Sequence, residues 1–125
     1  IYRETVRVTT NTAGAGSATG TAKTSKVVEG KVKAVYMDHD SSAPASVDLT
    51  IAESGQTPAL PILSVSNANT DAWIFPMQQA KDAASGSAIT NQGADVVAAD
   101  HLAVTIAQAN NSQVFDVTIV WDDGR

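Results

Sequence analysis

Apolar and polar side chains alternate with a period of two in five separate stretches of this chain, and this pattern constrains the fold more than any other feature. In the last stretch, Phe115, Val117 and Ile119 alternate with Asp116 and Thr118. Successive side chains of a β-strand point to opposite faces, so the alternation predicts strands with one face in a core and one in water. The five stretches are residues 2–9, 28–36, 47–51, 102–107 and 115–121.

Segments rich in Gly, Pro, Asn, Asp and Ser separate these stretches, as turns between strands require. Strands at this spacing predict an all-β fold with little or no helix. The architecture they indicate is an antiparallel β-sandwich or a barrel, jelly-roll-like in either case. The turn-forming segments are residues 11–17, 38–46, 54–61, 66–71, 85–93 and 110–113.

The two closing stretches, residues 102–108 and 114–121, are predicted to form a hairpin. The reason is the link between them, because Asn110 and Asn111 tolerate the positive backbone torsion angles that tight turns need.

Two further segments are ambiguous between helix and strand. Residues 77–84 contain good helix formers, but an extended segment is favoured, because Trp73-Ile74-Phe75 runs into them and Gly86 soon ends the run. In residues 94–99 the paired valines favour a strand.

A length of 125 residues predicts one β domain spanning residues 1–125. Within it, residues 11–20 consist largely of Gly, Ala, Ser and Thr and are predicted to form a mobile loop. The absence of cysteine excludes disulfides, thiolate zinc sites and cysteine nucleophiles. No apolar run approaches the roughly 20 residues that a membrane helix needs. We also expect no membrane surface as a partner, because acidic residues outnumber the basic ones that an anionic membrane would attract.

The charge is unevenly distributed along the chain. The net charge of −5 argues against a nucleic acid partner. Residues 1–33 carry +4, from six basic and two acidic side chains, whereas residues 34–125 carry −9. Both sets fit the solvated outer faces of strands. They also fit a molecule in which positive and negative charges are separated, with a basic patch that docks on acidic protein, including a second copy of the same chain. The basic residues of the first segment are Arg3, Arg7, Lys23, Lys26, Lys31 and Lys33.

The sequence lacks the signatures of enzymes. Gly14-Ala15-Gly16-Ser17 begins like a dinucleotide fingerprint, but no helical pattern follows it to hold a pyrophosphate. No serine lies in a Gly-x-Ser-x-Gly elbow, and the carboxylates lie mainly in loops and on the polar side of strands. We therefore expect no catalytic residue and no cofactor.

Two clusters contain residue types that bind metals, Asp38-His39-Asp40 and Asp100-His101. Neighbouring residues in a strand point to opposite faces, so His39 would not join its two flanking aspartates around one ion. We expect no metal site.

The aromatic residues divide into two groups. Tyr36, Phe115 and Trp121 share the apolar side of their strands and are predicted to pack in the core. Trp73 and Phe75 share a face with each other and follow a polar loop, so they are the candidates for an exposed patch, and a protein interface is favoured over a ligand site.

Several motifs resemble those of small virion proteins of tailed bacteriophages, and the resemblance covers residues 2–77. The assigned members of this group are head decoration (cement) proteins, which bind the outside of the capsid. The motifs are Glu4–Thr9, Gly16–Gly20, Gly30–Tyr36, Ala43–Ala45, Asp48–Ala52, Asn69–Trp73 and Phe75-Pro76.

The resemblance implies a non-enzymatic structural protein, made in the host cytoplasm and located on the capsid exterior of the virion. It also implies a homo-oligomer, with a trimer favoured, and the major capsid protein as its partner. Residues 1–10 are then the candidate strand for contacts with other subunits or with the capsid. The candidate interface residues are Arg3, Arg7, Lys31, Lys33, Trp73 and Phe75.

Two alternative functions fit the same pattern. One is another virion component, such as a tail, neck or fibre module. The other is a carbohydrate-binding or adhesive β-sandwich module, in which an exposed Trp73 would stack against a sugar.

Overall fold

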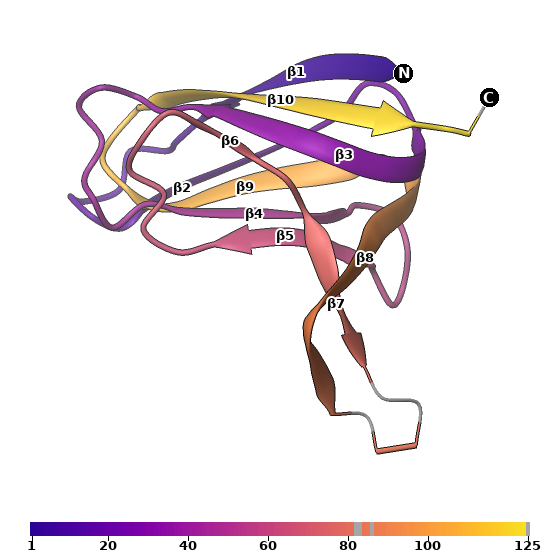
Figure 1. The fold of residues 1–125 in the computed structure, drawn as a ribbon. Helices are drawn as coiled ribbons and strands as arrows, with labels where there is room; N and C mark the ends of the chain where they lie inside the picture. Colours follow the sequence, from indigo (N-terminus) through magenta and orange to yellow (C-terminus); the bar gives the residue numbers. More distant parts are fainter. Residues whose placement is uncertain (82–83, 86, 125) are drawn as a thin grey trace.

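A computed structural model describes residues 1–81, 84–85 and 87–124 and confirms the all-β prediction. The part of the chain that it describes contains ten strands and no helix (Figure 1). The strands are β1 (Tyr2–Thr9), β2 (Ala18–Lys23), β3 (Val28–Asp38), β4 (Asp48–Glu53), β5 (Pro61–Val65), β6 (Ala72–Ile74), β7 (Met77–Lys81), β8 (Ala88–Asp100), β9 (Leu102–Ala109) and β10 (Val114–Asp122).

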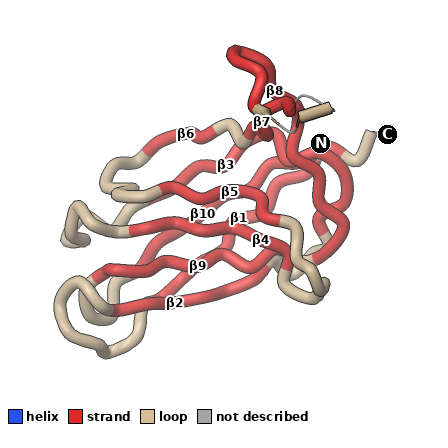
Figure 2. The backbone as a smooth tube through the Cα atoms, turned by 90° about the horizontal axis from the view of Figure 1, so that it is seen from below, coloured by secondary structure: helices blue, strands red, loops and turns tan. Residues whose placement is uncertain are grey.

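The strands form two antiparallel sheets that pack face to face as a sandwich (Figures 1 and 2). The larger sheet has the order β1-β10-β3-β8-β7, with β6 also paired to β3, and the smaller sheet has the order β2-β9-β4-β5. Without β6 and β7, this is the strand order of an eight-stranded jelly roll. Within the described residues each sheet has its own edge strands, so the barrel alternative is wrong.

The predicted hairpin of residues 102–121 is also wrong, because β9 and β10 belong to different sheets. Their link crosses from one layer to the other. It is held by the Thr10 hydroxyl, which donates to the Asn110 carbonyl at 2.8 Å, and by the Gln113 side chain, which accepts from the Asn110 N–H at 2.8 Å. The alternation predicts only that each strand has one apolar face directed into the core. Two consecutive strands meet this requirement equally well when they face each other from opposite sheets and when they are neighbours in one sheet.

The prediction that Tyr36 lies in the core fails because of a β-bulge in β3. Val32 pairs with Trp121 and Ala34 pairs with Val120, so Lys33 is an extra residue on this strand. An extra residue reverses the faces of everything that follows it. Val35 is consequently buried and Tyr36 lies on the outer face, half-buried. For the other two core aromatics, Phe115 and Trp121, the prediction is confirmed, since both are buried.

The predicted loop of residues 11–20 is too long, because β2 already begins at Ala18. The inward positions of β2 carry small side chains, Ala18, Gly20 and Ala22, so the sequence shows little alternation there. Gly20 is required for packing, because a Cβ at this position would lie 2.5 Å from the Thr9 carbonyl oxygen of β1.

Strand β7 and the first half of β8 form a projecting antiparallel hairpin, whereas β6, which precedes them, pairs with β3 in the larger sheet. The first half of β8 pairs with β7, from Met77 opposite Asp95 to Lys81 opposite Ala88, and its second half pairs with β3. Figures 1 and 2 show this hairpin leaving the body of the sandwich. The extended conformation predicted for residues 77–84 is confirmed over Met77–Lys81, residues 82–83 lie outside the described residues, and the strand predicted for residues 94–99 is confirmed.

Candidate protein-binding surface

Four large apolar side chains are exposed on the outer face of the larger sheet and form what we call the outer patch: Trp73, Phe75, Met77 and Val97. Between 46% and 67% of each side chain is exposed. The pairing places them on one face, because residues opposite each other in paired strands share a face. The pairs are Trp73 with Tyr36, Met77 with Asp95, and Val97 with Lys31.

The outer patch results from the same alternation that builds the core. Ile74 and Pro76, the positions between the exposed ones, point inward, where Ile74 packs against the core and Pro76 is buried. Trp73, Phe75 and Met77 consequently point away from the sandwich, and no element of the described chain covers them. Exposed apolar residues gathered on one face are typical of interaction sites.

An aromatic and cationic cluster borders the outer patch. The indole of Trp73 packs against the ring of Tyr36, with 5.1 Å between ring centroids and a tilt of 56°. The guanidinium carbon of Arg3, from β1, lies 5.8 Å from the centroid of a Trp73 ring. This distance is within the range of a cation–π contact. The structure therefore brings together two candidates that are 70 residues apart in sequence.

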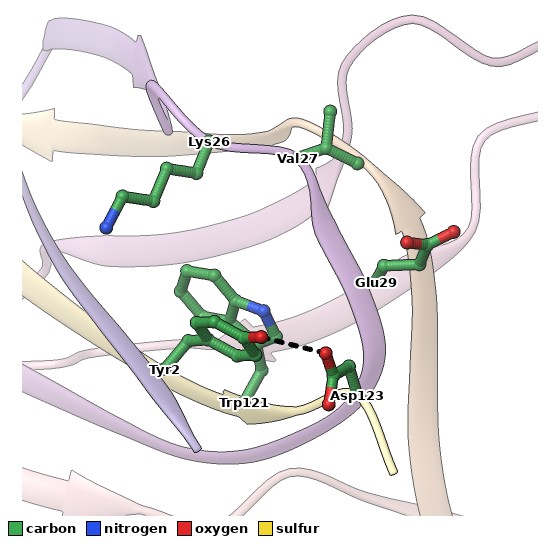
Figure 3. A pocket seen from close by; sticks show the side chains of 6 residues that line it. All are labelled: Tyr2, Lys26, Val27, Glu29, Trp121 and Asp123. Atoms are coloured by element: carbon green, nitrogen blue, oxygen red, sulfur yellow. Dashed lines mark hydrogen bonds between the residues drawn. The ribbon is translucent and has the colours of Figure 1, made fainter. Parts of the chain in front are cut away.

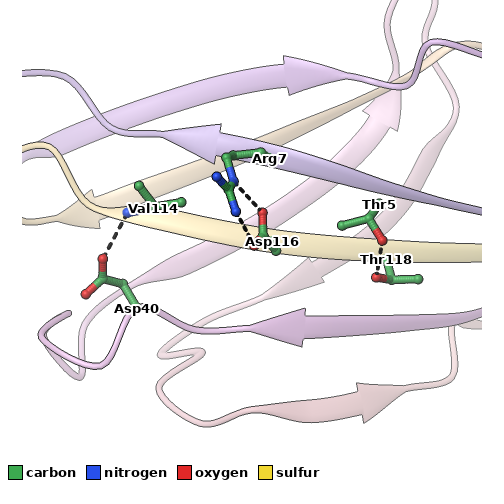
Figure 4. A network of polar contacts seen from close by, with 6 residues as sticks. All are labelled: Thr5, Arg7, Asp40, Val114, Asp116 and Thr118. Carbon is green, nitrogen blue, oxygen red and sulfur yellow. Dashed lines mark hydrogen bonds and ion pairs between the residues drawn. The ribbon is translucent and has the colours of Figure 1, made fainter.

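Arg7 does not belong to this cluster, because its charge is paired within the chain. Its Nε and Nη2 donate to the two carboxylate oxygens of Asp116 at 2.9 and 3.1 Å (Figure 4). The hydrogen bond and the charge of Asp116 raise the pKa of Arg7, and the bond from Arg7 lowers the pKa of Asp116. A guanidinium engaged at both ends of its fork is a poor docking group for a partner.

Lys31 and Lys33 share one acidic partner at the edge of the outer patch. Their amino groups lie 3.5 and 3.2 Å from the same carboxylate oxygen of Asp95. The hydrogen bond from Lys33 lowers the pKa of Asp95. Together with Val97 the two lysines line a cleft of about 300 Å³ that the C-terminal end of β10 closes on one side. Asp122 and Asp123 also line this cleft, so the edge carries charges of both signs.

Of the six candidate interface residues, five lie at or beside the outer patch and Arg7 does not. Two members of the patch, Met77 and Val97, are absent from the sequence prediction. Met77 could have been predicted from the sequence, because it follows Phe75 by two residues, as Phe75 follows Trp73. In an extended segment the three side chains therefore share one face. Val97 follows Val96, and only the pairing with β3 shows which of the two faces outward.

In each of the two clusters with metal-binding residue types, one aspartate accepts several hydrogen bonds from the protein, Asp40 in the first and Asp100 in the second. Asp40 accepts a hydrogen bond from the Val114 N–H at 2.9 Å (Figure 4). It also accepts hydrogen bonds from the N–H and the hydroxyl of Ser42. These bonds, that from Val114 above all, lower the pKa of Asp40. Asp100 accepts the N–H groups of Gly55 and His101 at 2.6 and 2.8 Å.

Among the described residues no group of three or more His, Asp or Glu side chains has the arrangement of a metal site. Across residues 1–81, 84–85 and 87–124 there is also no helix with the length and apolar character needed to cross a bilayer.

A scan against protein-family models finds no match, and searches of curated proteins and of solved structures also find no match. The exposed surface of the molecule is therefore the basis on which a function can be argued.

Proposed function

We propose that this chain is a non-enzymatic structural protein of a tailed-phage virion that decorates the outside of the capsid and binds the major capsid protein. The outer patch is the observation that carries the proposal, because it gives the domain an apolar, uncovered face with aromatic anchors. The resemblance of residues 2–77 to phage decoration proteins supports it. The jelly-roll strand order supports it as well, by analogy, since capsid domains are among the proteins that use this fold.

The composition of the outer patch and its border suits a protein interface. Tryptophan, tyrosine and arginine are the side chains that most often dominate binding energy at such surfaces. Trp73 packs against Tyr36 and lies within cation–π distance of Arg3, so part of its side-chain freedom is already lost before a partner covers it. The guanidinium of Arg3 beside Trp73 favours a partner surface with an acidic group next to an apolar centre.

The proposal includes a homotrimer located on the capsid exterior. Among the residues that the structure describes, β1 pairs only with β10 in the larger sheet, so its other edge has main-chain groups to which a neighbouring strand can pair. Contacts repeated around a symmetric oligomer raise the overall affinity even when each contact is weak. The same strand carries Arg3, so contacts between subunits and contacts with the shell would lie side by side.

The decisive experiment mixes purified protein with undecorated phage heads and measures occupancy by sedimentation and particle imaging. We expect Trp73→Ala with Phe75→Ala to reduce occupancy by about tenfold or more, because both anchors are removed. Leu60→Ala is the matched control, since Leu60 is an exposed apolar residue outside the outer patch and its loss leaves occupancy unchanged.

Charge reversal separates the two arginines. We expect Arg3→Glu to lower occupancy strongly, whereas Arg7→Glu has less effect, because Asp116 already pairs with the Arg7 charge. Full occupancy by the double variant of Trp73 and Phe75 would refute the outer patch as the docking face. Binding to isolated tails and not to heads would replace the capsid assignment with a tail, neck or fibre module.

A further inference from the structure

Strand β1 differs from the other edge strands of the sandwich in the regularity of its pairing. All of its residues pair with consecutive residues of β10, from Tyr2 with Trp121 to Thr9 with Val114, without a register shift. The pairing of β2, β5 and β7 with their neighbours is interrupted by a register shift in each case, and β6 has only three residues. Irregular, short or proline-containing edges resist the addition of a further strand. Among the residues that the structure describes, β1 is therefore the edge best suited to accept one.

The hydrogen bonds next to β1 show which of its main-chain groups point away from β10. In an antiparallel pair, alternate residues bond to the partner strand, and the residues between them direct both N–H and C=O outward. The Thr10 N–H donates to the Gln113 carbonyl at 2.9 Å, one position beyond the pair of Thr9 with Val114, so the even-numbered residues of β1 bond to β10. The Thr9 carbonyl correspondingly points to β2, where a Cβ on Gly20 would lie 2.5 Å from it.

Three of the odd-numbered residues, Arg3, Thr5 and Arg7, have an open edge. Their side chains are exposed, and β2 covers the edge only at Thr9. Within the described part of the chain, no element other than β10 pairs with β1, and the main-chain groups of these three residues bond to no loop or turn. This edge therefore presents three N–H and three C=O groups to an incoming strand.

Side chains fasten β1 to β10 along its length, so the free edge is held in place. The Tyr2 ring stacks on Trp121, with 5.6 Å between centroids, and its hydroxyl donates to Asp123 at 2.9 Å (Figure 3). The hydroxyls of Thr5 and Thr118 lie 2.7 Å apart in the middle of the strand (Figure 4). Little order has to be gained when a second strand pairs with an edge of this kind.

The free groups are arranged symmetrically about Thr5, and this symmetry selects a second copy of the same chain as the partner. When two β1 strands lie antiparallel with their Thr5 residues opposite each other, Arg3 of each copy faces Arg7 of the other. Every free N–H then meets a free C=O, which gives about six main-chain hydrogen bonds. A shift in either direction brings fewer of these groups together. The register also places the outer faces of both larger sheets on the same side.

The charges of the strand permit this register. Like charges opposite each other in a sheet destabilise the pairing, and here Arg3 would face Arg7 of the second copy. Asp116 removes this conflict, because its two carboxylate oxygens accept from the Arg7 guanidinium at 2.9 and 3.1 Å. The ion pair that keeps Arg7 out of the outer patch therefore suits it to this contact.

We propose that β1 pairs antiparallel with the β1 of a second copy of this chain, about a twofold axis at Thr5, and joins two larger sheets into one. A contact between two equal strands is twofold, so on a capsid it links one proposed trimer to the next instead of closing the trimer. The contact uses no residue of the outer patch, so it does not depend on docking to the capsid.

Cysteine cross-linking tests the register, because the chain has no cysteine of its own. With a short thiol-specific cross-linker, Thr5→Cys should link to itself, and a mixture of Arg3→Cys and Arg7→Cys should link one variant to the other. Arg3→Cys alone should not link, since the two copies of this position would lie about 14 Å apart along the strands, four residues at about 3.4 Å each. Lys23→Cys, on the interrupted edge strand β2, is the control and should not link.

A proline substitution tests the main-chain bonds. The Thr5 N–H faces away from β10, so Thr5→Pro removes a donor of the free edge and no donor of the ladder between β1 and β10. Sedimentation of the unmodified chain should show an association step that doubles the mass. We expect Thr5→Pro to weaken this step by at least about tenfold, because the twofold axis repeats the loss in both copies. Thr5→Val is the matched control, since it also lacks the hydroxyl but keeps the N–H, and it should associate normally.

A change of charge tests the role of the ion pair. Asp116→Asn leaves the Arg7 charge without its carboxylate, so Arg7 then repels Arg3 of the second copy. We expect the association to weaken by about threefold or more at low salt, and by less at 1 M salt.

The proposal fails if Arg3→Cys alone links as efficiently as the mixture, or if the unmodified chain shows no step that doubles the mass. It also fails if folded Thr5→Pro associates as tightly as Thr5→Val. Circular dichroism establishes that Thr5→Pro is folded, and the cross-linking result decides the question where it is not. Occupancy of phage heads separates this contact from the outer patch. Single copies of Thr5→Pro should still bind heads through Trp73 and Phe75, so either proposal can fail while the other stands.

Discussion

Strands β10 and β6–β7 share one sequence pattern and differ in their surroundings. In β10 the apolar positions face the second sheet, and Phe115, Val117 and Ile119 are fully buried. Along β6 and β7 the apolar positions Trp73, Phe75 and Met77 face away from it and stay exposed. A period of two thus predicts a strand with an apolar face, but whether that face is covered depends on which other segments the topology brings opposite it.

The sharpest test of this contrast uses two phenylalanines, Phe115 and Phe75. Phe115→Ala should lower the free energy of unfolding by about 3–5 kcal/mol, because it leaves a cavity in the core. Phe75→Ala should change it by less than about 1 kcal/mol, since the side chain is 67% exposed. Urea denaturation followed by far-UV circular dichroism measures both. Equal losses would mean that the outer patch is packed as tightly as the core.

A pair of glutamates extends the contrast to polar groups. Glu53 is 6% exposed, and its two carboxylate oxygens accept the N–H groups of Leu60 at 3.1 Å and of Ala99 at 3.0 Å, so it ties the smaller sheet to β8 of the larger one. Glu53→Ala leaves two donors without a partner and should cost about 2–3 kcal/mol.

Glu29 is the control for this experiment, because its side chain is exposed and bonds to nothing within the described residues. Glu29→Ala should change stability by less than about 0.5 kcal/mol in the same urea titration. A Glu53→Ala protein as stable as the Glu29→Ala protein would show that water replaces the buried acceptor.

The sequence predicts most strands of this fold but not their partners. Alternation identifies the segments that become β9 and β10, because large apolar side chains mark their inward positions. It misses β2, where the inward positions are Ala18, Gly20 and Ala22. The bulge at Lys33 has no sequence signal, because an extra residue in a strand becomes visible only when the strand is paired with its neighbours.

The candidate surface is predictable to a similar degree. Parity places Trp73 and Phe75 together, and charge places Arg3 and Arg7 among the candidates. That Arg3 packs on Trp73 while Arg7 pairs with Asp116 depends on contacts 70 and 109 residues apart in sequence. Local patterns contain no information about such contacts. The same is true of the stack between Tyr2 and Trp121, which joins the two ends of the chain.

Acid titration compares a carboxylate of the body with one beside the outer patch. The pKa values of Asp40 and Asp95 are both lowered, the first mainly by the Val114 N–H and the second mainly by Lys33. A carboxyl whose folded pKa lies below the unfolded value of about 3.9 stabilises the protein above that pH. This contribution is lost as the pH falls through the folded pKa.

We therefore expect Asp40→Asn to cost about 1 kcal/mol at pH 7, because charged acceptors bind donors more strongly, and to cost progressively less below about pH 4. Asp95→Asn should have a smaller effect at every pH, since its partners are exposed lysines. Thermal unfolding at a series of pH values measures both. A cost of Asp40→Asn that does not change between pH 7 and pH 3 would contradict the ionic origin.

The smallest expected effects separate the two arginines of β1. Arg7→Gln breaks an exposed ion pair with Asp116, so it should lower the melting temperature slightly at low salt and not at 1 M salt, where screening acts within about 3 Å. Arg3→Gln should leave the melting temperature unchanged under both conditions and shift the emission of Trp73, because a cation is removed from beside its ring. In a Trp121→Phe background, where Trp73 alone emits, Arg7→Gln should leave the emission unchanged. If Arg7→Gln shifted this emission as strongly as Arg3→Gln, Trp73 would not distinguish the two charges, and the border of the outer patch would have to include Arg7.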